Sequence, residues 1–312
     1  MTKTTLIITT RDRPQFLQLV VETAFKQTRP FHQIIISDNS SSNYFRSKNK
    51  SLLEPYLVRY PDHLELVQTP YNFPSGPGHA KYIQETFVGG ADFCIIFHDD
   101  DEMLPHYHET ALKILKSEKE LVAVGCNALK LKDTKLTHGT VMRKTEGLEF
   151  VKNSKQLLKY YMGIGPISAP PLCGYLFKTR VFKLIPFENN TGGKYSDVVT
   201  LTEATKFGPM IWSCEPLMKY RIHSMQDSKI VSTLDFRNLL NYMVKKGEFS
   251  SDSIYVQSYR FKHFRLKFKS ILKSGKWHSA KVVSIYLIYY TLRKLIWRKQ
   301  TYGYFWSKIT HK

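Results

Sequence analysis

Three adjacent aspartates, Asp99, Asp100 and Asp101, stand directly after an apolar run at 93–97. Adjacent carboxylates repel one another unless a cation or solvent neutralises their charge. A hard divalent ion held by one or two of them, with positions left for phosphate oxygens, removes that repulsion. The triplet therefore predicts a Mn²⁺ or Mg²⁺ site for a phosphate-bearing substrate, with a solvated acidic turn as the alternative.

Two further segments carry residue types that suit a nucleotide. Asp38 follows the apolar run 34–36, where nucleotide-binding sheets place an acid on the ribose or base, although an Asx turn is also common there. No Gly-x-Gly-x-x-Gly or Gly-x-x-x-x-Gly-Lys loop is present, which disfavours ordinary dinucleotide and P-loop sites. The first apolar run ends in backbone amides and arginines that can meet a nucleotide: Thr9, Thr10, Arg11 and Arg13.

The first hundred residues predict the scaffold that positions these side chains. Apolar runs alternate with segments of helical spacing, which implies right-handed crossovers and a mainly parallel sheet. Ligands bind such sheets at the carboxyl ends of the strands, so both acidic loops should lie along one edge. The expected strands are 6–9, 34–36, 64–67 and 93–97, and the expected helices begin at Pro14 and at His79.

The pattern continues less regularly beyond Pro105. We expect a helix to about 117, a strand at 121–124, a strand at 172–177, a helix at 197–207 and one or two strands at 210–220. The region up to Gly165 has no clear period. Beyond Leu234 helical spacing dominates, without convincing strands.

Three segments, 6–14, 36–40 and 97–105, together resemble the family 2 glycosyltransferases of the A-type (GT-A) fold in residue types, order and spacing. The segments 173–178, 195–197 and 215–223 are similar to that family's acceptor-side strand, catalytic acid segment and closing Tyr-Arg-x-His element. The resemblance covers about residues 4–228. In two departures, His98 stands where many members have the first acid of their motif, and Ser196-Asp197 replaces a Glu-Asp pair.

The resemblance implies a Rossmann-like α/β fold, a mainly parallel nucleotide-binding sheet flanked by helices. It also implies an inverting, metal-dependent enzyme that uses a nucleotide sugar, with a UDP-sugar favoured, on a glycan or lipid-linked acceptor of bacterial surface polysaccharide. Asp197 is the expected general base, and Glu203 is its rival. The residues carried over are Asp38 at the base or ribose, Asp99 and Asp100 at the donor, and Asp99, Asp101 and His223 at the metal.

Charge divides the chain into an expected catalytic domain, 1–232, and a basic amphipathic helical extension, 233–312. From Phe236 onward the chain has 17 Lys or Arg against two acids, whereas residues 1–235 have 29 against 24. Such asymmetry points to a polyanionic partner. Aromatic residues interleave with the cations, which suits a helix on an anionic membrane surface; helices packed on the catalytic domain are the alternative. They include Phe261, Phe264, Phe268, Trp277, Tyr286, Tyr289, Tyr290 and Trp297.

Other features bear on location and on rival functions. The four cysteines are widely spaced, no leader pattern is present, and the longest apolar run, 282–292, is shorter than the roughly 20 residues of a membrane span. We expect a cytoplasmic protein, peripheral at the inner face of the cell membrane. Nucleotidyl transfer is a rival enzymatic function, but the glycine- and lysine-containing loop that would bind its phosphates is not found near the first strand. The rival outside the enzymes is a nucleic-acid or anionic-surface binding protein with an inactive sheet domain, but no nucleic-acid motif accompanies the charge.

Overall fold

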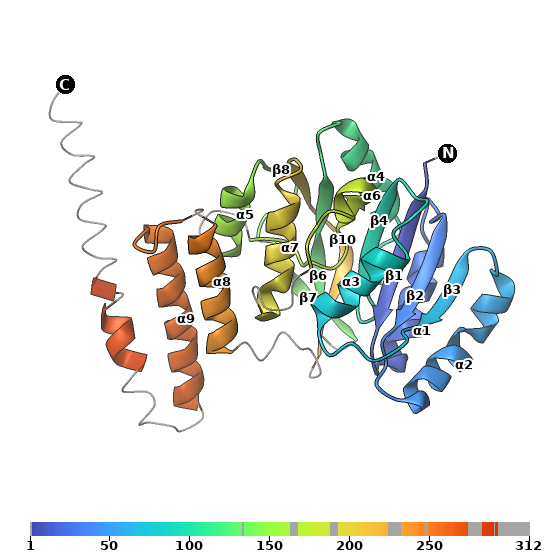
Figure 1. The fold of residues 1–312 in the computed structure, drawn as a ribbon, viewed down its shortest axis with the longest axis horizontal. Coiled ribbons are helices and arrows are strands. Elements are labelled where there is room, and N and C mark those ends of the chain that lie inside the picture. Colours follow the sequence, from blue (N-terminus) through green and yellow to red (C-terminus); the bar gives the residue numbers. More distant parts are fainter. Residues whose placement is uncertain are drawn as a thin grey trace.

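The computed structural model describes residues 2–132, 134–162, 168–187, 193–223, 232–246, 249–273, 283–289 and 291–292. Within them a ten-stranded sheet runs in the order β3-β2-β1-β4-β9-β6-β10-β5, with β7 beside β6 and β8 beside β10 (Figure 1). The strands are β1 (Thr4–Thr10), β2 (Gln33–Asp38), β3 (Leu64–Gln68), β4 (Phe93–His98), β5 (Glu102–Met103), β6 (Ala123–Lys132), β7 (Lys135–Thr140), β8 (Leu148–Val151), β9 (Leu176–Lys178) and β10 (Met210–Ile222). The helices are α1 (Pro14–Phe25), α2 (Asn43–Arg59), α3 (Gly76–Thr86), α4 (Tyr107–Ser117), α5 (Ser154–Tyr161), α6 (Thr179–Phe182), α7 (Ser196–Ala204), α8 (Thr233–Lys245) and α9 (Ile254–Lys273), with a 3-10 turn, η1 (Gly193–Tyr195).

The amino-terminal half of the sheet is parallel, as the sequence predicts. Ile8 of β1 pairs with Ile36 of β2 and with Phe97 of β4, so the three strands end together. The acidic loops after β2 and β4 consequently lie on one edge of the sheet. The other half is mixed, because β5, β7, β8 and β9 run antiparallel to their neighbours.

Alternate residues of β1 feed two hydrophobic cores, one on each face of the sheet. Leu6 and Ile8 pack with Leu17 of α1 and with residues of α2 and α4. Ile7 packs on the other face with residues of α3, α5, α7 and α8. Burial on both faces explains why this strand is an uninterrupted apolar run rather than an alternating one.

Several elements differ from the sequence-based expectations. Helix α2 was not expected, since it contains Pro55 and buries only Asn49 and Leu53. Strand β6 continues eight residues beyond the expected end at Val124, and β10 is one strand of 13 residues. Helix α5 and strands β7 and β8 lie in the region without a clear period, where short elements pack on β6 and β10 rather than forming crossovers.

The helical character predicted beyond Leu234 is present in α8 and α9, which stand side by side at the end of the molecule opposite α2 (Figure 1). Ser232 and Asp235 form a capping box at the start of α8. Phe236 of α8 and Tyr259 of α9 belong to the same core as α5 and α7. The boundary at 232/233 therefore marks a change in charge along the chain, but the hydrophobic core continues across it. Trp277, Tyr290 and Trp297 lie outside the described residues.

Candidate active site

The end of β1 supplies two partners to the acidic loop after β4. Thr10 Oγ1 donates a hydrogen bond to Asp99 Oδ2 at 2.6 Å. The Arg13 guanidinium lies 2.7 Å from Asp99 Oδ1 and 2.7 Å from Asp100 Oδ2. Pro14 begins α1 immediately after Arg13, so the start of this helix fixes the position of the arginine. Arg13, predicted to meet a nucleotide, here neutralises part of the acidic triplet.

His223, at the end of β10, reaches the same loop from the other half of the sheet. Its Nε2 lies 2.9 Å from Asp100 Oδ2, and its ring packs 5.1 Å from the ring of Phe16. Both His223 and Asp100 are buried. Of the three acids, His223 therefore meets Asp100, and not the Asp99 and Asp101 with which it was grouped as a metal ligand.

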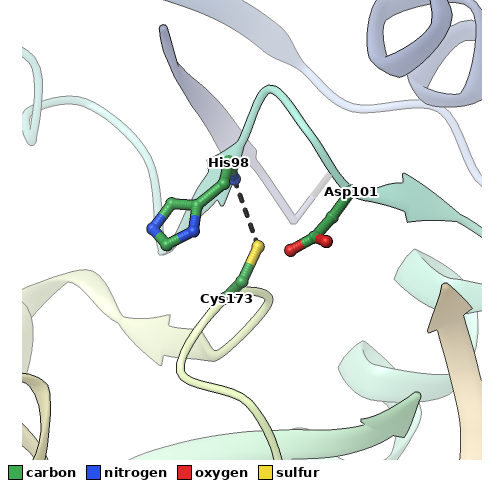
Figure 2. Close-up of side chains that lie close together, drawn as sticks. All are labelled: His98, Asp101 and Cys173. Carbon is green, nitrogen blue, oxygen red and sulfur yellow. Dashed lines mark hydrogen bonds between the residues drawn. The ribbon is translucent and has the colours of Figure 1, made fainter. Parts of the chain in front are cut away.

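Asp101 has a different environment. Its Oδ1 accepts a hydrogen bond from the backbone N–H of Arg221 at 2.8 Å, and the buried carboxylate also interacts with the Cys173 thiol. Burial, and then the charge of Asp100, raises the pKa of Asp101 well above its usual value. Figure 2 shows its carboxylate facing Cys173, whose Sγ accepts from the backbone N–H of His98 at 3.1 Å. One ligand atom each from His98, Asp101 and Cys173 lies within 4.8 Å of the others. Burial, and then the charge of Asp101, raises the pKa of the Cys173 thiol well above its usual value. It is therefore a poor ligand for a hard ion at neutral pH.

Arg221 holds the acidic loop in place, a role that the sequence pattern does not predict. Its Nε donates to the Asp100 carbonyl at 2.8 Å and its Nη2 to Glu102 Oε1 at 2.5 Å. The guanidinium also stacks over Phe16 at 5.1 Å. Arg221 belongs to the Tyr-Arg-Ile-His element that the sequence analysis identifies, so the motif could have pointed to it. In the structure this arginine positions the loop.

The electrostatics differentiate the neighbouring acids. Burial raises the pKa of Asp99 to about 7, although the Arg13 guanidinium opposes that rise. For Asp100 burial also raises the pKa, but the charges of Arg13, His98 and His223 outweigh it and hold the pKa below the ordinary value. Asp100 is therefore ionised at neutral pH, next to a histidine nitrogen.

The loop after β2 is built around Asp38, which is fully buried. Its Oδ1 accepts from the Ser40 N–H at 2.9 Å, an Asx turn, and its Oδ2 accepts from Asn49 Nδ2 at 3.1 Å. Asp38 thus shapes the loop. Arg11 remains half exposed at the rim and donates to Asn72 Oδ1 at 3.2 Å, while Thr9 Oγ1 donates to the Phe97 carbonyl at 3.4 Å.

Asp197 lies in the first turn of α7, half-buried, with Oδ1 accepting from the Val198 N–H at 2.8 Å. Burial raises its pKa to about 6. Burial, and to a lesser degree the Asp197 charge, raises the pKa of four surrounding tyrosines. They are Tyr161, Tyr175, Tyr195 and Tyr259. One of them, Tyr175, follows the Cys173-Gly174 turn that faces Asp101, and its ring fits only because residue 125 is glycine: a Cβ there would lie 2.5 Å from Tyr175 Cζ.

Glu203, the rival base, is committed elsewhere. Tyr242 of α8 donates to its Oε1 at 2.5 Å, and the ammonium groups of Lys206 and Lys246 lie beside it. Burial raises the pKa of Glu203, but these hydrogen bonds and charges together lower it below the usual value. A fully paired carboxylate of low pKa joins α7 to α8 and is a weak proton acceptor.

A divalent ion fits the donor set at this sheet edge. The carboxylate of Asp100 and the imidazole of His223 are ligand types that Mn²⁺ and Mg²⁺ accept. The His223 Nδ1 atom is buried without a hydrogen-bond partner among the described residues, and such an orphaned group is costly unless a ligand satisfies it.

Comparison with known proteins agrees with this geometry. The model of the family described as Glycosyl transferase family 2 matches residues 5–178. No curated protein sequence matches the chain. Among solved structures, S. aureus TarS aligns with a TM-score of 0.57 at 13% identity over 84% of this chain, which spans only 44% of that chain. TarS 1–349 in complex with UDP-GlcNAc aligns with a TM-score of 0.53 at 11% identity, over 96% of this chain and 92% of that one.

A third similar structure is the mannosyltransferase PcManGT from Pyrobaculum calidifontis in complex with GDP-Man and Mn²⁺. It has a TM-score of 0.53 and 13% identity, over 94% of this chain and 87% of that one. At such identities the structural likeness shows the shared GT-A fold alone. The family model, however, matches more than half of the chain, and the protein therefore belongs to glycosyl transferase family 2 and is a glycosyltransferase.

Proposed function

We propose that the protein transfers a sugar, with inversion, from a nucleotide-sugar donor to a glycan or lipid-linked acceptor in the synthesis of a cell-surface polysaccharide. A UDP-sugar is the favoured donor, in line with the UDP and UDP-GlcNAc complexes of TarS. The observation that carries the proposal is the meeting of Asp100 and His223, from two halves of the sheet, at the edge where such sheets bind nucleotides.

We assign the metal to Asp100 and His223, whose facing atoms lie 2.9 Å apart. Among the neighbours, PcManGT and GalNAc-T7 were solved with Mn²⁺. When bound, the ion neutralises the diphosphate that leaves the sugar. This assignment replaces Asp99 of the predicted set with Asp100, because His223 contacts Asp100, whereas both Thr10 and Arg13 hold Asp99.

Asp197 is assigned as the general base. A carboxylate whose pKa is about 6 is largely ionised at neutral pH and still basic enough to accept the acceptor's hydroxyl proton. Direct attack of that hydroxyl on the anomeric carbon inverts its configuration. Arg13 and Arg221 act before the reaction, since they hold the acid loop that the donor meets.

The donor class is tested by a thermal-shift screen of UDP-, GDP- and dTDP-sugars, each with Mn²⁺ and with EDTA. A ligand that binds the folded state increases the free energy of unfolding, by about 2.7 kcal/mol when its concentration is one hundred times its Kd. The unfolding temperature rises as a result. We expect one nucleotide class to stabilise the protein only with the ion. No stabilisation by any donor, alongside salt-sensitive binding of nucleic acid, would support the inactive-domain alternative instead.

We further propose that the carboxyl-terminal segment holds the enzyme at the inner face of the cell membrane. Among the described residues no helix is long and apolar enough to cross a membrane. The last described segment nevertheless exposes large apolar side chains in a strongly basic part of the chain, a combination that suits adsorption to anionic lipid. They are Ile285, Tyr286, Ile288, Tyr289 and Leu292.

A chain ending at Lys273 tests this anchoring, because the cut removes eight Lys or Arg and no acid yet keeps the core residues of α8 and α9. Each basic residue near an anionic leaflet contributes about 1 kcal/mol, screened by salt. We expect the full chain to cosediment with anionic vesicles at low salt and to be released at high salt, and the shortened chain to lose most binding while retaining donor affinity. Equal sedimentation of both chains would refute the anchoring. A cut at Ser232 is unsuitable, since it removes Phe236 and Tyr259 from the core.

A further inference from the structure

A site lined by basic side chains lies at the edge of the sheet opposite the acidic triplet. A cavity of about 630 Å³ opens beside Phe93, where β4 begins, whereas Asp99 follows the end of the same strand. Six residues of strand at about 3.3 Å each put the two ends ~20 Å apart. The cavity is therefore separate from the donor site. Its lining consists of Ala91, Asp92, Phe93, Lys119, Lys178, Thr179, Arg180 and Lys183.

Four cations and one acid line this cavity, and the cations come from two segments, the end of α4 and the continuous β9–α6 unit. Lys119 follows α4, Lys178 ends β9, and Arg180 and Lys183 belong to or follow α6. None of the four forms an ion pair within the described part of the chain, while Lys178 Nζ donates to the Lys119 carbonyl. Burial and the adjacent Arg180 lower the pKa of Lys178, so these like charges are held together against their repulsion.

The other polar groups of the wall take no part in binding an anion. Thr179 lines the cavity, but its Oγ1 is buried against the Cys94 thiol and does not reach a ligand. The acid, Asp92, is already engaged, because its Oδ2 accepts from the Lys3 backbone N–H at 2.9 Å. A concave site of several hundred Å³ with converging donors and unpaired cations has the size and chemistry of a small-molecule anion site.

We infer that this cavity, through Lys119, Lys178, Arg180 and Lys183, binds a molecule that carries at least two phosphate groups. One phosphate would leave uncompensated part of the net charge of about +3 that four cations and Asp92 give the lining, whereas a diphosphate spans the cations of both segments. The diphosphate group can belong to a free solute or to a lipid headgroup. Neither source involves the acidic triplet or a divalent ion.

Inorganic pyrophosphate in EDTA is the probe, titrated calorimetrically into the full chain at low salt. The test variant is the double substitution Lys119→Ala and Lys183→Ala, since both side chains are exposed and neither has a packing role. The matched control is Lys48→Ala with Lys50→Ala on α2, which removes the same charge elsewhere. We expect at least a tenfold weaker pyrophosphate Kd in the test variant and an unchanged Kd in the control.

Equal Kd values in wild type and test variant, or equal losses in both variants, would overturn the site. Metal-dependent donor binding should be unchanged in the test variant, so the failure of this site and of the proposed donor site are distinguishable. Vesicles with a polyprenyl diphosphate, compared with vesicles matched in charge by phosphatidylglycerol, identify the source. Selective loss of binding to the diphosphate vesicles in the test variant assigns the site to a lipid, and loss for free pyrophosphate alone assigns it to a solute.

Discussion

Replacing Asp197 with Asn is expected to lower turnover by about 100- to 10,000-fold, the contribution of a positioned general base, and to leave the donor Kd within about twofold of wild type. The substitution keeps the size of the side chain and its hydrogen bond from the Val198 N–H, so the start of α7 should persist. Binding and chemistry separate because Asp197 lies among tyrosines rather than in the acidic triplet. Single-turnover kinetics with saturating donor and acceptor give the rate, and titration of the donor gives the Kd.

Glu203→Gln is the matched control, since Glu203 lies six residues further along the same helix. It should lower thermal stability, because Tyr242, Lys206 and Lys246 lose a charged partner, but alter turnover little. The reverse pattern, with Glu203→Gln inactive and Asp197→Asn active, would transfer the role of base to Glu203. A large loss of donor affinity in Asp197→Asn would place Asp197 in the donor site instead.

The pH dependence supplies an independent measure of the same residue. Because burial raises the pKa of Asp197 to about 6, its basic form is fully populated above that pH and is lost as the pH falls through it. We expect the transfer rate to fall about tenfold per pH unit below pH 6 and to level off above pH 7. In the Asp197→Asn variant this limb should disappear. An unchanged acid limb in that variant would mean that another group controls it.

The amino-terminal half of the fold is predictable from the sequence, because the patterns that specify its strands are local. Uninterrupted apolar runs such as 6–9 and 34–36 form strands buried on both faces, and their common direction places the loops that follow on one edge. The second half depends on pairings that no local period reveals. Strand β9 is three residues long and pairs antiparallel with both β4 and β6, which only the assembled sheet specifies.

The candidate site divides in the same way. Residue types and motifs predict the acidic triplet, His223 and Asp197 as site residues, but they do not predict the partners that the structure gives them. Arg13 pairs with Asp99 and Asp100, 86 and 87 positions away, and Arg221 reaches a loop about 120 positions away. Such contacts set the environment of each acid: Thr10 and Arg13 hold Asp99, and Asn49 holds Asp38, whereas Asp100 meets His223. The spacing of residues along the chain does not predict which acid has which partner.

Asp100→Asn is expected to abolish metal-dependent donor binding and to lower transfer by on the order of a thousandfold. A divalent ion contributes several kcal/mol of charge stabilisation at the leaving phosphate, and each 1.4 kcal/mol is tenfold in rate. Asp100 is the acid next to His223, and its pKa is held low. Its negative charge is therefore available to bind the ion. Mn²⁺ titration by calorimetry, with and without the donor, measures the loss, and Asp62→Asn on an exposed turn is the control.

The neighbouring acids distinguish this assignment from the alternatives. Asp99→Asn should reduce activity less, because burial already raises the pKa of Asp99 and Thr10 and Arg13 hold it. His223→Gln should weaken Mn²⁺ binding alongside Asp100→Asn, and the double variant should be no worse than the more damaging single one, since both act on one ion. Normal Mn²⁺ affinity in Asp100→Asn, with loss in Asp101→Asn and Cys173→Ser, would instead move the ion to the group in Figure 2 formed by His98, Asp101 and Cys173. That group contains a thiol and an imidazole, so it would favour zinc over manganese, and competition between the two ions would show the difference.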